Sequence, residues 1–416
     1  MALASRHLQR CLRARPFLRA PRAGASGRRL ACAAAPEKQR LVFLGTPEVA
    51  AIVLEELLTA AKAPDASFEV AVVVSQPGKP KGRGNKAVPV PSPVEQLARA
   101  AGVPDDRILC PKTARDPAFL EALSALRPDL CVTAAYGNML PAAFLSIPRR
   151  GTLNIHPSLL PRYRGAAPVQ RALQDGVAET GVSVAFTVLA CDAGPVLEQR
   201  AAAPGADEAA PALLERLFRL GARLLVARLG DVWSGAAAGA AAPQDEAAAT
   251  HAPKLSKEEA AMDFSSKSAQ ELHNQVRAFA PWPGTVADFI IAPAAAEDGG
   301  VGGVGGGAPA EGERLQIKIL TTRVADASEL PPGAAAARRV AWAPPGRMLV
   351  PCGGGGALEV LALQQPAKKA VAARDFANGL KGRQVYVASP AAAAAAAPAA
   401  EGAAAAGAVA GSGAAR

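Results

Sequence analysis

The chain has 416 residues and a formal net charge of +10, and its length is sufficient for two domains with ordinary cores. Every long apolar run is interrupted by charged residues, glycine or proline, which disfavours a membrane-spanning helix. Four cysteines follow the first 35 residues at wide spacing and without a C-x-x-C pair, which disfavours a disulfide framework and a zinc site: Cys110, Cys131, Cys191 and Cys352.

Much of the positive charge lies in residues 1–35, which hold eight arginines but no lysine or acidic residue. Without this segment, 38 of the 46 basic residues remain against 36 acidic residues, a net charge of +2. An arginine-rich, acid-free start is typical of an organellar transit peptide, and a basic disordered arm is the alternative. The spacing of Leu8 and Leu12 among arginines favours a mitochondrial address over a plastid one. We therefore expect residues 1–36 to be a disordered transit peptide.

Strand and helix patterns alternate after this segment. An apolar strand over 40–44 leads into Gly45-Thr46-Pro47, where Thr46 is the expected cap of a helix over 49–58. Because only one glycine is present, a dinucleotide site of the G-x-G-x-x-G type is disfavoured. Further strands are predicted over 69–75, 129–134, 152–156 and 181–190, and further helices over 93–101, 118–126, 166–175 and 212–229. This alternation predicts an α/β domain over 38–235 with a Rossmann-like, mostly parallel sheet.

A basic segment interrupts this alternation at 76–93. Its four basic residues are interleaved with glycine and proline, which predicts an exposed loop without regular structure: Lys79, Lys81, Arg83 and Lys86. A solvated surface loop is the simplest interpretation. The functional alternative is a contact with nucleic-acid phosphates, which basic loops position without reading sequence.

The second half of the chain has a different composition. Residues 236–258 are rich in alanine, glycine and proline and are expected to form a linker. A second domain over 259–388 begins with a helix over 269–278 and continues with short strands over 285–291, 315–321, 347–350 and 358–363, which suggests a small β-barrel. The 292–313 insertion and the 389–416 tail lack a core-forming pattern and should be disordered.

The strand over 152–156 carries the most informative polar residues. Alternation along a strand places Asn154 and His156 on one face and Leu153 on the other, and Pro157 should end the strand beside them. A lone histidine is more often structural than catalytic. The context of His156 favours the catalytic interpretation, because Asp192 follows a neighbouring predicted strand. The sequence Asp-Ala-Gly-Pro is, however, also typical of a turn.

This trio suits acyl transfer to an amine without a covalent intermediate, because a histidine paired with a carboxylate can move a proton and an amide can hold an oxyanion. Ser158 is disfavoured as a nucleophile because no G-x-S-x-G motif is present. Cys131 and Cys191 lie in apolar runs and are expected to be core thiols.

These residues carry a resemblance to a known family. NIHPSLLPRYRGAAPVQ at 154–170, with CDAG at 191–194, resembles the folate-dependent formyltransferases. Five further segments are similar to the methionyl-tRNA formyltransferase family within that group: FLGTPE at 43–48, the basic segment at 76–94, KLSKEEA at 254–260, RAFAPWPG at 277–284 and the stretch at 363–379. Ala280 departs from the family, which usually has asparagine there.

The resemblance implies transfer of a formyl group from 10-formyltetrahydrofolate to the α-amino group of initiator methionyl-tRNA, without a metal, by a monomeric enzyme that does not bind membranes. Asn154 would stabilise the oxyanion, His156 would bind the intermediate and move the amine proton, and Asp192 would orient the imidazole. The resemblance further implies a folate pocket lined by Ser158, Leu159, Leu160, Pro161, Tyr136 and Gly137. Lys79, Lys81, Arg83 and Lys86 would contact the tRNA acceptor stem, and an OB-like second domain would add backbone contacts.

Two alternatives remain open at this stage. One is a formyltransferase that uses the same trio on a small amine, such as glycinamide ribonucleotide or an amino sugar, which would need neither the basic loop nor a tRNA-binding domain. The other is a non-catalytic RNA-binding protein on an inherited fold. With an organellar address, the resemblance predicts initiation of translation in mitochondria, with plastids as the alternative.

Overall fold

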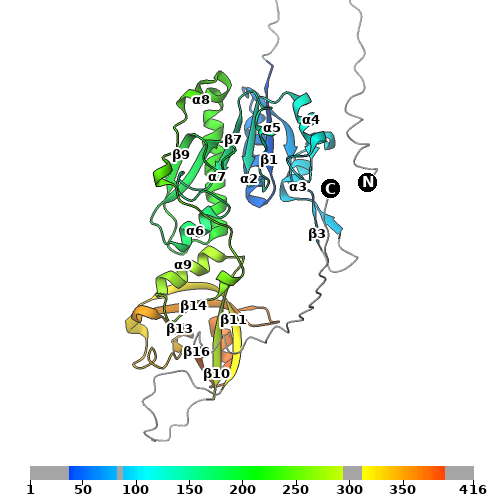
Figure 1. Ribbon diagram of the computed structural model, residues 1–416. Helices are drawn as coiled ribbons and strands as arrows, with labels where there is room; N and C mark the ends of the chain where they lie inside the picture. The colour runs from blue at the N-terminus through cyan, green and yellow to red at the C-terminus, as the bar shows by residue number, and fades with distance from the viewer. Residues whose placement is uncertain (1–36, 82–87, 294–311, 389–416) are drawn as a thin grey trace, which may run out of the picture. The chain divides into compact units, whose positions relative to one another are not determined.

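The computed structural model describes residues 37–81, 88–293 and 312–388 (Figure 1). Contacts between residues divide the chain into two compact units, the first comprising residues up to 259 with 274–283, and the second 260–273 with residues from 284 onward. The expected transit peptide, the Ala-rich tail and nearly all of the 292–313 insertion lie outside the described residues. Within the described part of the chain, no helix is both long and apolar enough to cross a bilayer.

The first unit is built on a seven-stranded sheet in the order β5-β2-β1-β6-β7-β8-β9. Five strands run parallel: β1 (Gln39–Gly45), β2 (Phe68–Val74), β5 (Ile108–Leu109), β6 (Leu130–Ala134) and β7 (Thr152–His156). β8 (Thr180–Phe186) and β9 (Val196–Ala202) continue the sheet in antiparallel pairing. The predicted mostly parallel, Rossmann-like sheet is thereby confirmed. Strand order reverses between β1 and β6, which is the place where open α/β sheets bind ligands.

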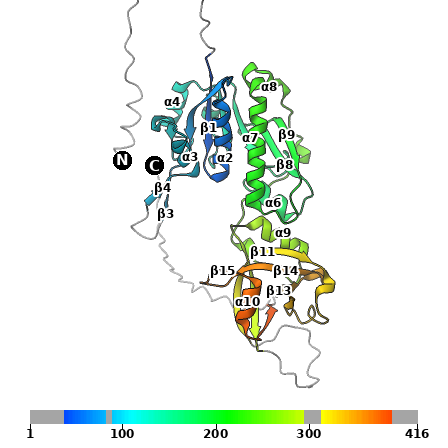
Figure 2. The same cartoon turned by 180° about the vertical axis from the view of Figure 1, so that it is seen from behind.

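Helices cover both faces of this sheet (Figures 1 and 2). One face packs against α2 (Glu48–Ala61), α3 (Pro93–Ala100), α6 (Pro168–Gln174) and α7 (Ala210–Ser234) in the largest apolar cluster. The other packs against α4 (Pro117–Leu126) and α5 (Ala142–Leu145). Leu153 and Ile155 of β7 belong to the first cluster, so the side chains of Asn154 and His156 lie on the opposite face, as their alternation predicts.

The basic segment is more regular than its composition predicts. β3 (Lys79–Lys81) and β4 (Val88–Val90) form an antiparallel hairpin whose intervening residues 82–87 lie outside the described residues. The prediction that this segment has no regular structure was wrong. Pro80 and Pro89 face each other across the ladder, and a proline pair is compatible with a ladder only at a position that needs no N–H donor.

Three further expectations about the first unit are corrected. Thr46 does not cap α2, because its hydroxyl donates to the carbonyl oxygen of Tyr136 at 2.9 Å and ties the β1 and β6 loops together. The strand expected over 181–190 ends at Phe186, so Asp192 lies in the turn before β9, a strand that the sequence did not indicate. The 236–258 segment is not a linker, because it belongs to the first unit: it contains α8 (Ala236–Ala240) and a stretch hydrogen-bonded to the loop after β7.

The second unit is an antiparallel sheet in the order β12-β13-β14-β11-β10-β16, with β15 also paired to β14. Its strands are β10 (Thr285–Ala292), β11 (Glu313–Ala325), β12 (Ala341–Ala343), β13 (Arg347–Pro351), β14 (Ala357–Gln364), β15 (Ala370–Ala372) and β16 (Gln384–Val387). Helix α9 (Ala269–Phe279) and the four predicted strands are confirmed, whereas β12, β15, β16 and α10 (Ala373–Leu380) were not predicted. The curled antiparallel sheet agrees with the expected small barrel.

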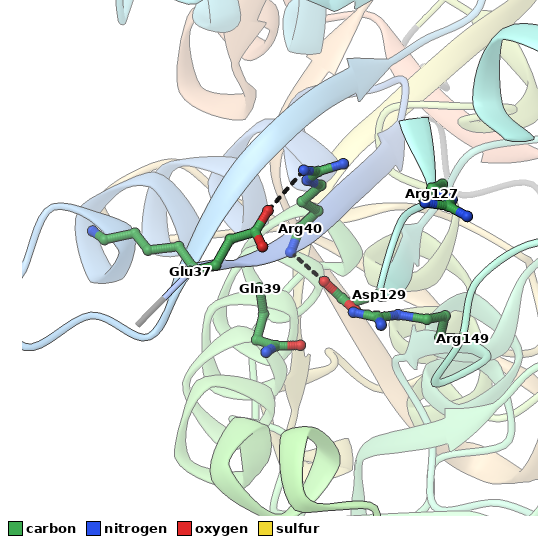
Figure 3. A pocket seen from close by; sticks show the side chains of 7 residues that line it. Glu37, Gln39, Arg40, Arg127, Asp129 and Arg149 are labelled. Carbon is green, nitrogen blue, oxygen red and sulfur yellow. Dashed lines mark hydrogen bonds and ion pairs between the residues drawn. The ribbon is translucent and has the colours of Figure 1, made fainter. Parts of the chain in front are cut away.

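A pocket of about 370 Å³ lies where β1 and β6 begin, at the opposite edge of the sheet from the ends of β6 and β7 (Figure 3). The buried Asp129 is its centre: one carboxylate oxygen accepts from the backbone N–H of Arg40 at 2.7 Å and the other from Arg149 Nε at 2.7 Å. Because the Asp129 charge is satisfied within the protein and no member of the trio lines this pocket, we place the chemistry elsewhere.

Helix α7 lies close to the sheet because of one glycine. A Cβ at Gly221 would lie 2.5 Å from Ile155 Cγ2 and 2.7 Å from Val182 Cγ2. Gly230 of the same helix is exposed and has nothing within 4 Å of a Cβ. We expect Gly221→Ala to lower the free energy of unfolding by about 1–3 kcal/mol through overpacking. Gly230→Ala is the matched control and should raise it by up to about 1 kcal/mol. Chemical denaturation of both variants checks this, and equal stabilisation of the two would contradict the packing.

Candidate active site

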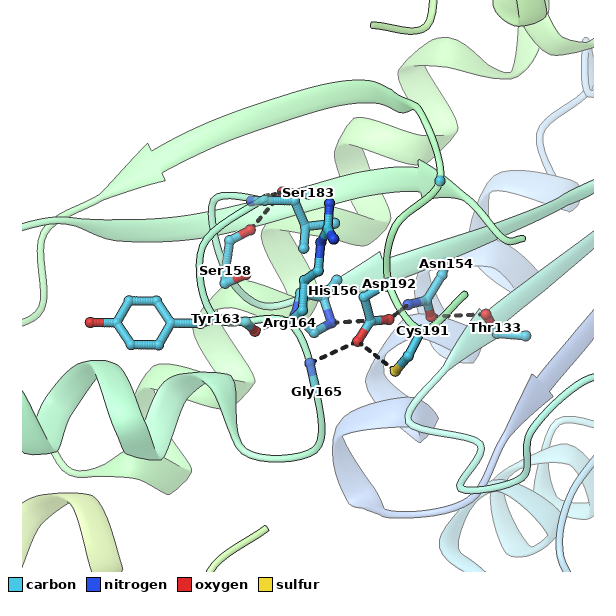
Figure 4. Close-up of polar contacts among 12 residues, drawn as sticks. Thr133, Asn154, His156, Ser158, Tyr163, Arg164, Gly165, Ser183, Cys191 and Asp192 are labelled. Carbon is cyan, nitrogen blue, oxygen red and sulfur yellow. Dashed lines mark hydrogen bonds and ion pairs between the residues drawn. The ribbon is translucent and has the colours of Figure 1, made fainter. Parts of the chain in front are cut away.

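The candidate site is built where β6 and β7 lie side by side (Figure 4). Asn154 and His156 are the third and fifth residues of β7, and Thr133 of β6 is the register partner of Asn154. Alternation places all three side chains on the sheet face that α4 and α5 cover only in part. His156 is buried and Asn154 is half-buried, so the ring is largely shielded from water while the amide remains reachable.

Asp192 completes the trio from the turn between β8 and β9 (Figure 4). Its Oδ1 lies 3.5 Å from Asn154 Nδ2 and 3.8 Å from His156 Nδ1. Its Oδ2 accepts the backbone N–H of Gly165 at 2.9 Å. The residue has a left-handed φ of 51°, which aspartate tolerates better than most side chains. The structure therefore brings the three sequence-predicted catalytic residues together.

Thr133 fixes the direction of the Asn154 amide. The threonine hydroxyl donates to Asn154 Oδ1 at 2.8 Å, and the amide nitrogen faces Asp192. A carboxylate can only accept hydrogen bonds, so the atom that faces it must be the nitrogen. The N–H groups of Asn154 are therefore directed toward the space between the three side chains, which is where a developing oxyanion would need a donor.

A backbone carbonyl orients the imidazole. His156 Nε2 lies 2.9 Å from the carbonyl oxygen of Tyr163, whose ring points away from the trio (Figure 4). Because a carbonyl only accepts, Nε2 carries the proton and Nδ1 of the neutral ring is left as the acceptor that faces Asp192. The sequence predicted that Asp192 orients the ring. In the structure the Tyr163 carbonyl makes that hydrogen bond, and Asp192 lies at ion-pair distance.

Cys191 adds a weak donor to the carboxylate. Its Sγ lies 3.5 Å from Asp192 Oδ2, and the residue is exposed, so the expectation of a core thiol was wrong here, whereas Cys131 is fully buried. Although the residue as a whole is exposed, desolvation of the sulfur and the negative charge of Asp192 raise the pKa of Cys191 to about 11. The thiol therefore keeps its proton near neutral pH.

The residues predicted to line the folate pocket fall into two groups. Ser158 is buried, and its hydroxyl donates to the carbonyl oxygen of Arg162 at 2.7 Å, so it shapes the turn after β7. Leu160 is buried, and Leu159 and Pro161 are half-buried in the same turn. At the end of β6, Tyr136 is buried and belongs to the apolar cluster that includes α4 and α5 residues. Gly137 is exposed beside it.

Two of the four residues predicted to contact tRNA lie on strand β3, and the other two lie outside the described residues. Lys79 is exposed on β3. Lys81 is the last residue of β3, and its side chain lies outside the described part of the structure. Arg83 and Lys86 belong to residues 82–87, which lie outside the described residues altogether.

Sequence reasoning missed the supports of the trio. Thr133 and Gly165 could have been found from the sequence, since Thr133 lies in the predicted strand over 129–134 and Gly165 lies in the motif at 154–170. Tyr163 contributes only a backbone carbonyl, so its identity carries no signal. Gln244 lies in the segment interpreted as a linker, and its side chain reaches the backbone of Asp192. Among the described residues, no group of three or more His, Cys, Asp or Glu side chains is arranged to hold a metal ion.

Comparison with known proteins identifies the family to which the chain belongs. Residues 39–229 match the family model of the formyl transferase domain, and residues 254–381 match that of the formyl transferase C-terminal domain. The chain therefore belongs to the formyltransferase family.

Comparison with individual relatives of similar length narrows the similarity to one group of formyltransferases. The chain is 38% identical over 340 residues to a methionyl-tRNA formyltransferase from Methylococcus capsulatus, which covers 82% of this chain and 96% of the relative. It is 39% identical over 339 residues to the methionyl-tRNA formyltransferase of Pseudomonas paraeruginosa, with 82% and 95% covered. Among solved structures, a HypX variant from Aquifex aeolicus is similar in fold, with a TM-score of 0.51 and 15% identity over 83% of this chain and 48% of that one.

The Thr133 hydroxyl provides a test of the site geometry. We expect Thr133→Val to lower kcat about tenfold, because the Asn154 amide loses the bond that directs its N–H groups. Thr152→Val is the matched control, because the Thr152 hydroxyl on the adjacent strand is buried without a hydrogen-bond partner among the described residues. Steady-state kinetics of the formyl transfer checks both, and an unchanged kcat in Thr133→Val would contradict the assigned role.

Proposed function

We propose that this protein transfers the formyl group of 10-formyltetrahydrofolate to the α-amino group of methionine on initiator methionyl-tRNA. The observation that carries this proposal is the convergence of Asn154 and His156 on the Asp192 carboxylate, at 3.5 Å and 3.8 Å, on the scaffold of a formyltransferase. The match to methionyl-tRNA formyltransferases extends over both units of the chain, which favours this acceptor over a small amine.

The three side chains have separate tasks in such a transfer. The amine nitrogen attacks the formyl carbon, a C–N bond forms, and the former carbonyl oxygen gains negative charge. Asn154 Nδ2–H, held in direction by Thr133, donates to that oxygen. The bond between the formyl carbon and N10 of the folate then breaks. Overall the amine gives up one proton and N10 gains one, so no oxidant, reductant or metal is required by the balance of the reaction.

His156 can move that proton. Its Nδ1 is the unprotonated ring nitrogen, and it faces the same space as the Asn154 amide. When Nδ1 takes the proton of the attacking amine, the resulting imidazolium lies beside the Asp192 carboxylate at ion-pair distance, and the opposite charge stabilises it. The same nitrogen can then return the proton to the leaving N10. Asp192 thus stabilises a charge that appears only during the reaction.

The folate donor fits the edge of the sheet at which the trio lies. Leu159 packs closely on β8, since a Cβ at Gly181 would lie 2.5 Å from Leu159 Cδ2, and Met139 in the loop after β6 is 60% exposed. Apolar side chains that are exposed or half-buried in loops at the ends of β6 and β7 can provide contact surface for a flat heterocycle. We propose that the turn Ser158–Pro161 and the loop around Gly137 hold the donor.

The assay for this function uses the purified full chain, methionyl initiator tRNA and labelled 10-formyltetrahydrofolate, scored for N-formylmethionine. We expect Asn154→Ala to lower kcat by roughly 10²-fold, the scale of one lost oxyanion donor. Glycinamide ribonucleotide and amino sugars are tested in parallel as acceptors. Faster formylation of either small amine than of methionyl-tRNA would replace the proposed acceptor with the alternative one.

The β3–β4 hairpin supplies a second prediction. Replacing Lys79, Lys81, Arg83 and Lys86 with alanine should raise KM for methionyl-tRNA about tenfold or more and weaken its salt dependence, because phosphate contacts are lost. KM for the folate donor should not change. A control variant replaces four exposed basic residues of the same unit, Lys62, Arg107, Lys112 and Arg115. An equal effect of the two quadruple variants would show that net charge, not the hairpin, matters.

We propose a mitochondrial location, with plastids as the alternative, because the acid-free, arginine-rich residues 1–35 have the composition of a transit peptide. A fluorescent protein fused behind residues 1–36 should enter mitochondria. A second fusion with all eight arginines of this segment changed to glutamine should stay outside. Retention of the first fusion in the cytosol would contradict the proposal.

A further inference from the structure

We infer that Gln244 and Arg164 are positioning residues that hold the Asp192 carboxylate in place, although neither belongs to the trio. The inference rests on the proposed function, because it concerns how the same site is held during formyl transfer. Gln244 comes from the ordered stretch after α8, about fifty residues beyond Asp192 in the chain. The composition of this stretch suggests a linker, but the Gln244 side chain reaches the backbone of the turn that carries Asp192.

The Gln244 amide closes the turn that carries Asp192. Its Nε2 donates to the carbonyl oxygen of Asp192 at 2.7 Å and to that of Gly194 at 2.7 Å. Both N–H donors of the amide are thereby used on one turn. Asp192 has a left-handed φ of 51°, and a Cβ at Gly194 would lie 1.8 Å from the Phe186 carbonyl oxygen, so this turn is tight. A tight turn with two carbonyls bound by one amide has little freedom to move its side chain.

Arg164 fixes the direction of the Gln244 amide. The buried guanidinium donates to Gln244 Oε1 through Nε at 3.0 Å and through Nη2 at 2.8 Å. Because a guanidinium only donates, the oxygen of the amide must face it and the nitrogen must face the turn. Glu246 holds the other side of the guanidinium with two hydrogen bonds of 2.8 Å. The bonds thus form one chain, Glu246–Arg164–Gln244–Asp192.

The same stretch also holds the second support of the trio. The backbone N–H of Arg164 donates to the Thr250 carbonyl at 2.8 Å, and the Arg164 carbonyl accepts from Ala252 N–H at 2.7 Å. The residues on either side of Arg164 make the two bonds already described: the Tyr163 carbonyl accepts from His156 Nε2, and the Gly165 N–H donates to Asp192. The segment 244–252 therefore fixes both the turn of the carboxylate and the loop that orients the imidazole.

Gln244→Glu separates a positioning role from a purely structural one. A glutamate keeps the length of the side chain and gains an ion pair with Arg164, but it cannot donate to the two carbonyl oxygens. We expect kcat to fall about tenfold or more, because small misplacements of a reacting group are costly. KM for methionyl-tRNA and for the folate donor should remain within about twofold, and kcat is measured well below the Tm of each variant so that loss of folded protein does not contribute. Gln244→Met removes the donors without adding charge and should give the same loss of kcat.

A double-mutant cycle identifies the residue through which Gln244 acts. In an Asp192→Asn background, Gln244→Glu should have little further effect on kcat, because the group that it positions has already lost its charge. Gln96→Glu is the matched control. Gln96 lies exposed on α3, and its amide also donates to a backbone carbonyl oxygen, that of Pro91, at 2.7 Å. It should retain the wild-type kcat.

The outcomes are distinguishable. If the unmodified protein does not formylate methionyl-tRNA, the proposed function fails. If it does and both Gln244 variants turn over at its rate, the positioning role fails. An equal loss from Gln244→Glu with and without Asp192→Asn would also overturn the role, because it would show an effect that does not pass through the carboxylate.

Discussion

The site depends on the hydrogen bond from the Gly165 N–H to the Asp192 carboxylate, because this bond joins the loop after β7 directly to the catalytic carboxylate. One loop follows β7 and carries the carbonyl that orients His156, and the other connects β8 to β9. A carboxylate held by a backbone N–H cannot swing away from the imidazole without losing a charge-assisted bond. The remaining Asp192 oxygen is consequently left facing both Asn154 and His156.

The fold explains why these loops meet here. Strand order reverses between β1 and β6, and β7 extends the sheet on the β6 side, so loops after these strands open at one edge. The antiparallel β8 and β9 then return a turn to the neighbourhood of β7. Close contact of α7 with the sheet at Gly221 packs the other face, which leaves the polar residues of β7 on the side where chemistry can occur.

The sequence predicts those features that depend on neighbouring residues. The bounds of β7 are as expected, because Thr152–His156 alternates and Pro157 cannot continue a ladder. Features that depend on distant partners were missed or wrong. Pro80 and Pro89, each considered alone, disfavour a strand. Because they face each other across the ladder, they are compatible with a hairpin. Gln244 lies in a stretch whose composition suggests a linker, and only the fold brings its amide to Asp192. Likewise the bond that orients His156 comes from a backbone carbonyl, which any residue at 163 would supply.

The chemistry requires that His156 Nδ1 be the unprotonated nitrogen that faces Asn154 and Asp192. Nitrogen-15 labelling of histidine is well suited to a test, because the chain has only four histidines. Loss of one set of signals in His156→Gln assigns this ring. At pH 8 we expect its neutral form to carry the proton on Nε2, with an Nδ1 chemical shift typical of an unprotonated nitrogen. A neutral ring protonated on Nδ1 would contradict the proposed route of the amine proton, because the nitrogen beside the carboxylate would then have no lone pair to accept it.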